Sequence, residues 1–170
     1  NTLGFTLMVG GAWPKIWLRD IKGLREVNEH SNRLNAQHVV PVWNAAGQVF
    51  SAIADLAVRA SAPNVNALCE AIDLYENSLQ CRGIWHSTMN CCLAEAYLSI
   101  GELTKALAAV TTGLEVMEAN EERCYEPELH RVHGVVLARQ DRPAADSDAE
   151  ASMRKAIELA KLRSAKSFEL

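Results

Sequence analysis

Two histidines on one short segment are the residues best placed for metal chemistry in this chain. His130 and His133 lie three residues apart, and Glu126 and Glu128 lie just before them. Two imidazoles at this spacing on a helix could share a metal ion. A structural role is the better interpretation, with His133 at a packing position and His130 exposed. We therefore predict no metal and no cofactor.

Two adjacent cysteines are the candidate nucleophiles. Cys91 and Cys92 follow His86 on a segment with helical spacing. Neighbouring residues on a helix point about 100° apart, so the two thiols cannot easily bind one metal together. We expect one thiol to pack inward as a small apolar group and the other to face a groove. Because a catalytic Cys–His pair would need a shaped, electropositive pocket, packing is the favoured interpretation and no catalytic residue is predicted.

Common sequence signatures of catalysis are missing. The chain has no glycine-rich phosphate loop followed by lysine, no GxSxG and no HExxH. Its net charge of -4 argues against a general nucleic-acid-binding surface, which is normally basic. These observations predict a protein that is not an enzyme and makes no direct contact with nucleic acid.

Length and cysteine usage limit where such a chain works. Its 170 residues suffice for about one domain with a sizeable core. Five cysteines without a CxxC pair favour a reducing compartment. The most apolar run, residues 3–13, is shorter than the roughly 20 residues that cross a bilayer. We expect a cytoplasmic chain with no membrane contact and, because it begins with Asn1 and ends in what resembles another helix start, a fragment of a larger multidomain protein.

The elements that position these residues are expected to be helices. Apolar residues recur every three or four positions, and no segment shows the alternation of a strand. Proline and asparagine mark the breaks, with Asn35 as a stop and residues 61–66 as a loop. The helices are predicted at about residues 2–19, 21–34, 41–59, 67–79, 84–100, 102–119, 127 to the loop at 140–148, and 149–162.

The segment from Leu93 to Gly113 predicts how these helices pair. Gly101 breaks the helix, and small residues at Ala94, Ala106 and Gly113 allow two helices to approach closely. This pattern is typical of a tetratricopeptide-type (TPR) hairpin, which stacks on copies of itself.

Equivalent small residues support a repeat. Ala52, Ala94 and Gly134 are separated by 94 − 52 = 42 and 134 − 94 = 40 residues, longer than the usual TPR period of about 34. The predicted fold is all-α: a right-handed α-solenoid of about four TPR-like hairpins that forms a single domain over residues 1–170. A HEAT-like geometry stays open.

The second half carries a family pattern. Its residues are Leu93-Ala-Glu-Ala-Tyr97, Gly101, Gly113 and the run ERCYEPELHRVHG at 122–134. From Ile84 onward the chain resembles the C-terminal helical-repeat region of bacterial transcriptional regulators that carry a P-loop ATPase before the repeats. The chain departs from the family at Asp141, where a turn glycine is common, and the loop at 141–148 is longer than usual.

The resemblance implies a role for the chain. Many of these regulators have an N-terminal winged-helix DNA-binding domain, whereas others carry a nucleotide cyclase domain. We expect a non-enzymatic protein-interaction module with a signal-sensing or autoregulatory role, whose partner is a protein, a peptide or another domain of the same chain. The alternatives are a regulatory domain of a nucleotide cyclase or kinase, a stand-alone TPR scaffold, an all-helical enzyme and an oligomerisation domain.

The first helix of each hairpin is expected to line the binding groove, since the concave face of a solenoid usually accepts the partner. The four tryptophans could also line a groove, although filling between hairpins is favoured. The predicted partner-binding residues are Val49, Ile53, Thr88, Cys91, Glu95, Glu128, Arg131 and Val135.

Overall fold

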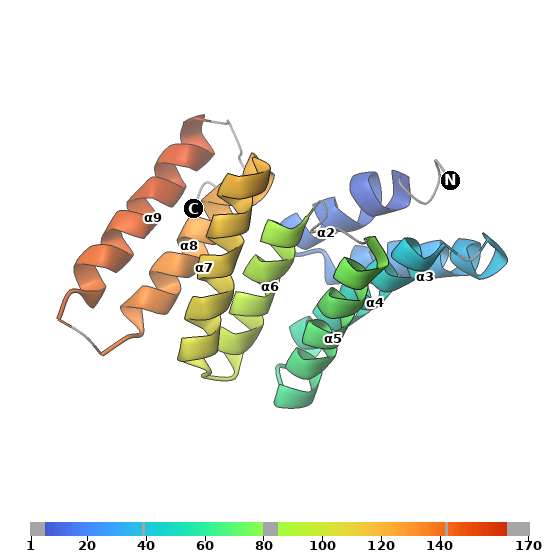
Figure 1. Ribbon diagram of the computed structural model, residues 1–170, viewed down its shortest axis with the longest axis horizontal. Helices are drawn as coiled ribbons and strands as arrows, with labels where there is room; N and C mark the ends of the chain where they lie inside the picture. The colour runs from blue at the N-terminus through green and yellow to red at the C-terminus, as the bar shows by residue number, and fades with distance from the viewer. Residues whose placement is uncertain (1–5, 39, 80–84, 142, 163–170) are drawn as a thin grey trace. The chain divides into compact units, whose positions relative to one another are not determined.

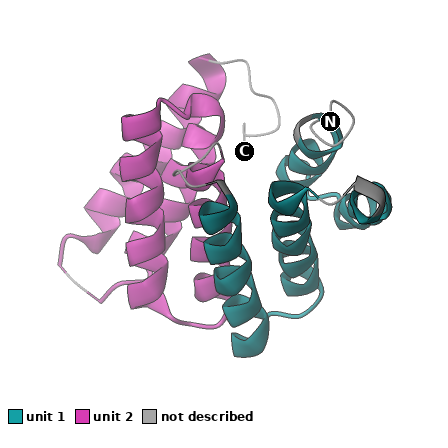
Figure 2. Ribbon diagram, turned by 45° about the vertical axis from the view of Figure 1, so that its right-hand side comes forward, with its two compact units in different colours: residues 1–83 teal, residues 84–170 magenta. Residues whose placement is uncertain are grey.

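The computed structural model describes residues 6–38, 40–79, 85–141 and 143–162, and all regular structure in them is helical. This confirms the all-α class. The chain divides into two compact units, residues 1–83 and 84–170, which Figure 2 shows in teal and magenta. The continuous four-hairpin solenoid and the single domain stay predictions.

Unit 1 begins with a short irregular helical segment and continues with three long helices (Figure 1). Helix α3 packs against η1 and α4, and α4 packs against α5. The elements are the π-helix η1 (Leu7–Ala12), α2 (Trp13–Trp17), α3 (Ile21–His38), α4 (Pro41–Val58) and α5 (Ala62–Leu79).

The turn between α2 and α3 is made without glycine. Of the helix predicted over 2–19, residues 2–5 lie outside the described residues. The described part is mainly η1 followed by the short α2, with Pro14 in the first turn of α2. Arg19 takes a left-handed φ of 56° and separates α2 from α3. Asp20 then accepts hydrogen bonds from Gly23 N at 2.8 Å and Lys15 Nζ at 2.7 Å. Its carboxylate thus satisfies a backbone donor at the start of α3.

Two predicted breaks in unit 1 are wrong. Asn35 does not end α3, which continues to His38, but its Oδ1 accepts a hydrogen bond from Val40 N at 2.8 Å. The loop expected at 61–66 is largely the first turn of α5. Ser61 accepts from Asn64 N at 3.5 Å, and Pro63 occupies a first-turn position where its missing N–H costs nothing.

The core of unit 1 is built around one tryptophan. Trp13 is fully buried and meets Phe50 of α4 edge to face, with ring centroids 5.2 Å apart. This is a favourable aromatic geometry. Leu24 and Leu68 are also fully buried. Trp13 is therefore a filler between helices, as favoured for the tryptophans.

Unit 2 contains two helix hairpins, α6–α7 and α8–α9, with α8 also packed on α6 and α7. Figure 1 shows them from green to red. The elements are α6 (His86–Ser99), α7 (Leu103–Asn120), the 3₁₀-helix η2 (Arg123–Tyr125), α8 (Glu126–Ala138) and α9 (Ala145–Leu162).

Glycines set the turns and the close contacts of unit 2. Gly101 has a φ of 81° between α6 and α7, a conformation that L side chains rarely adopt. A Cβ on Gly113 would lie 2.7 Å from Leu129 Cδ2, and one on Gly134 would lie 3.0 Å from the backbone oxygen of Ala149. The close approach of α6 and α7 predicted at Gly113 is confirmed, since the same Cβ would lie 3.2 Å from Asn90 Cβ of α6. Helix α9 starts at Ala145, earlier than predicted.

We predict that Gly134→Ala destabilises the chain although alanine is the better helix former. The helix propensity gain is about 1 kcal/mol, but the new methyl group meets backbone of α9, which cannot move as a side chain can. The free energy of unfolding should fall by about 1–2 kcal/mol in urea titrations. Gly10→Ala is the control, since the nearest atom there is 4.0 Å away. An equal or stabilising effect of both substitutions would contradict the packing.

Candidate functional site

Three of the predicted partner-binding residues converge in unit 2. Arg131 of α8 donates from Nη2 to Glu95 Oε1 of α6 at 2.6 Å and to Glu128 Oε1 at 2.7 Å, and its Nε donates to Glu128 Oε2 at 2.8 Å. The Glu128 side chain is only 8% exposed, against 22% for Arg131 and 26% for Glu95. The fork of the guanidinium thus joins two helices through a partly buried charge cluster.

This cluster, Glu95–Arg131–Glu128, has a structural consequence. Breaking a buried ion pair leaves an uncompensated charge, so substitutions here change stability as well as any partner contact. The three residues are predicted partner contacts, and the structure shows in addition that they hold α6 against α8. A binding assay on their variants must therefore be accompanied by a stability measurement.

Three other predicted residues lie inside the helix packing. Val49, Thr88 and Cys91 are fully buried, so they are not exposed groove residues as predicted. Thr88 and Cys91 are buried because most of the surface of α6 is covered, including its polar residues Ser87 and Thr88. Ile53 and Val135 are half-buried. Their role in binding stays a prediction.

The thiols of α6 are poor candidates for chemistry. Burial, reinforced by the negative charge of Glu95, raises the pKa of Cys91 well above its usual value. The thiolate, which is the nucleophilic form, is therefore disfavoured. Cys92 is buried as well, so the expectation that one of the two thiols faces a groove is wrong.

The prediction for one of the two histidines of α8 is wrong. His130 is buried at 8% exposure rather than exposed, and no hydrogen-bond partner for its Nε2 lies in the described structure. Burial, and after it the positive charge of Lys155, lowers its pKa to about 4. His133 is half-buried, and its Nδ1 lies 3.0 Å from Ser152 Oγ of α9. Among the described residues, no group of three potential ligands is placed to hold a metal.

A further polar site, which was not predicted, lies in unit 1. A groove of about 720 Å³ runs between α3, α4 and α5. Its lining combines amide, hydroxyl and carboxylate side chains with small residues. The lining residues are Asn32, Asn35, Ala36, Pro41, Asn44, Gly47, Gln48, Ser51, Ala52, Asp55, Ala67, Glu70 and Ala71.

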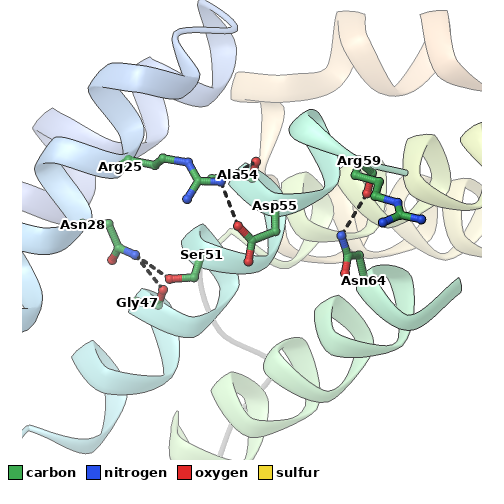
Figure 3. Close-up of polar contacts among 8 residues, drawn as sticks. All are labelled: Arg25, Asn28, Gly47, Ser51, Ala54, Asp55, Arg59 and Asn64. Carbon is green, nitrogen blue, oxygen red and sulfur yellow. Dashed lines mark hydrogen bonds and ion pairs between the residues drawn. The ribbon is translucent and has the colours of Figure 1, made fainter. Parts of the chain in front are cut away.

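Hydrogen bonds between α3 and α4 fix one side of this amide groove. Asn28 Nδ2 donates to Gly47 O at 3.0 Å and to Ser51 Oγ at 2.9 Å, as Figure 3 shows. Further along the same pair of helices, Arg25 Nη2 lies 2.8 Å from Asp55 Oδ1. These contacts hold the lining residues of α4 in register with α3.

A sequence signal for the amide groove exists. Asn44, Gln48, Ser51 and Asp55 follow one another at spacings of four, three and four residues, which places them on one face of α4. The neighbouring helix carries Asn28, Asn32 and Asn35 at spacings of four and three. Asparagine also serves as a helix stop and as a cap, so this repetition does not by itself indicate a groove.

No family model, curated protein or solved structure matches this chain. Among the described helices, none combines the length and apolarity needed to cross a bilayer.

We predict that Arg131→Met costs about 2 kcal/mol in the free energy of unfolding, because it strands the nearly buried Glu128 carboxylate. The matched control is Arg154→Met, which removes an ion pair to Glu150 whose side chains are both largely exposed. That change should cost less than about 0.5 kcal/mol. Chemical denaturation of both variants measures the difference, and equal losses would refute the proposed coupling of α6 to α8.

We predict that His130 makes the fold acid-sensitive. Its folded pKa of about 4 lies below the ordinary value near 6.5, so the unfolded state binds the proton more readily. Above pH 6.5 His130 is neutral in both states and the fold keeps its full stability. As the pH falls toward 4, the unfolded state binds the proton first, and stability is lost. Glu126 and Glu118 oppose the shift, and His133 adds to it.

Between pH 7 and pH 4.5 the free energy of unfolding should drop by about 1–2 kcal/mol more than in His130→Gln, since solvent screens part of the effect. Parallel urea titrations at pH 7 and 4.5 test this, and identical pH slopes would exclude it.

Proposed function

We propose that this chain is a non-enzymatic protein-interaction module that binds a peptide segment in the amide groove of unit 1. The observation that carries the proposal is the groove itself, whose lining combines polar side chains from three helices with small residues. Amide side chains both donate and accept hydrogen bonds, as a peptide backbone does. A groove lined in this way supports peptide binding without requiring one particular sequence.

The parent protein is proposed from the resemblance of the second half. The run ERCYEPELHRVHG forms η2 and the first part of α8, and its Pro127 lies in the first turn of α8. We propose that the chain is the regulatory C-terminal part of a bacterial transcriptional regulator with an ATPase domain. Peptide binding in the amide groove would then be the event through which it senses a signal or restrains the ATPase.

Filling the amide groove should abolish peptide binding. The exposed Ala67 lines the groove from α5, so Ala67→Trp places an indole there without changing charge. Peptides selected from a random display library on the intact chain should bind this variant at least about tenfold more weakly by fluorescence anisotropy. Asn66→Trp, at an exposed position next to Ala67 that does not line the groove, is the control. Peptides that bind both variants equally, or a library that yields none, would refute the proposal.

A further inference from the structure

The amide groove offers hydrogen-bonding groups that the protein leaves unused. Within the described residues, the exposed side chains of Asn32, Asn44 and Gln48 form no hydrogen bond with the protein. They come from two helices, α3 and α4, and line the same volume. Each primary amide carries two N–H donors and a carbonyl acceptor, so one ligand can be held from both sides.

The spacing along α4 suits an extended chain. Asn44, Gln48, Ser51 and Asp55 are separated by about 6, 4.5 and 6 Å along the helix at 1.5 Å per residue. Alternate residues of an extended peptide repeat every 6.6 Å or so. The stretch from Asn44 to Asp55 therefore covers about five residues of such a peptide, whose backbone presents donors and acceptors on the same scale.

The described lining of the groove carries negative charge. It contains Asp55 of α4 and Glu70 of α5, and none of the described lining residues is a lysine, arginine or histidine. Arg25 neutralises part of the Asp55 charge from outside the lining, at 2.8 Å. The exposed Glu70 carboxylate makes no ion pair within the described residues. The field in the groove therefore favours a cationic group and disfavours an acidic one.

A buried acceptor beside the groove gives an independent indication of a ligand. Asn28 is only 6% exposed, and within the described residues its Oδ1 has no hydrogen-bond partner. This oxygen lies 3.2 Å from the position that a Cβ on Gly47 would occupy, and Gly47 lines the groove. Unsatisfied buried acceptors are uncommon, because each costs the free energy of a lost hydrogen bond. Asn32 Oδ1 lies 2.5 Å from the same position, so a donor would supply what Asn28 lacks by displacing the exposed Asn32 side chain.

We infer that the amide groove selects an extended peptide segment that carries a lysine or arginine. Asn32, Asn44 and Gln48 hold the peptide backbone, while Glu70 and Asp55 bind the cationic side chain. The inference rests on the proposed function and adds the chemical class of the partner. Its selectivity comes from charge and its affinity from the backbone, so the two contributions are separable by mutation.

The experiment uses the full chain and three pools of labelled eight-residue peptides, random except for a fixed central Lys, Gln or Glu. By fluorescence anisotropy the Lys pool should bind about fivefold more tightly than the Gln pool, with the Glu pool weakest. Raising the salt to 0.5 M should shrink this preference, since exposed charges are screened. Glu70→Gln should remove most of it, whereas Asp73→Asn, an exposed acid on the same helix outside the lining, should leave it intact.

Gln48→Ala separates the backbone contribution from the charge. It should weaken all three pools by a similar factor without changing their order. Spermidine should compete poorly, because it has charge but no peptide backbone. Pools that bind with equal affinity, a Lys preference that survives Glu70→Gln, or spermidine that competes as well as the Lys pool would each overturn the inference. Peptide binding that Ala67→Trp still abolishes would then keep the proposed function, whereas binding by no pool would remove both.

Discussion

Neighbouring helices in both units pack at glycines whose missing side chain leaves room for the helix opposite. On Gly134 the space is taken by Ala149 backbone and Met153, and on Gly113 by Leu129. On Gly47 it is taken by an amide, with Asn32 Oδ1 only 2.5 Å from where a Cβ would lie. The same device therefore gives an apolar, tightly closed contact in unit 2 and a polar one in unit 1. In unit 1 the glycine at this contact, Gly47, is also part of the lining of the amide groove.

Close helix packing also dictates the fate of the polar side chains caught at the contact. In unit 1 Asn28 is held by Gly47 and Ser51 and so fixes α3 against α4. In unit 2 Arg131 reaches across to Glu95 and fixes α8 against α6. A buried polar side chain that keeps its hydrogen-bond partners holds two helices together. Losing a partner would leave the buried group unsatisfied, which costs free energy. Fixed helices in turn give the exposed amides of the groove a constant spacing.

Much of the fold was predictable because its signals are local. Pro41 and Gly101 act through their own backbone geometry, so helix α4 and the α6–α7 turn lie within one or two residues of the prediction. Asn35 and residues 61–66 were misjudged because asparagine and serine serve both as helix stops and as caps, and only the surrounding chain decides between the two.

The candidate site was less accessible to sequence reasoning. Glu95, Glu128 and Arg131 were assigned to the first helices of two hairpins, but sequence alone does not show whether they contact one another or a partner. Val49, Thr88 and Cys91 were assigned to an open face because helical periodicity locates a face but not what covers it. The amide groove requires two helices to be seen together, which no single stretch of sequence displays.

The buried thiols of unit 2 can report how often this unit opens locally. Cys91 and Cys92 are enclosed by packed helices, whereas Cys124, in η2 of the same unit, is exposed. A thiol reagent therefore modifies Cys124 in the closed unit but reaches the other two only during local opening. The modification rate of Cys91 and Cys92 divided by that of Cys124 measures how often the unit opens. Cys124 supplies the reagent's intrinsic reactivity within the same molecule. Ligand effects on that ratio would report coupling between the groove and unit 2 without any added probe.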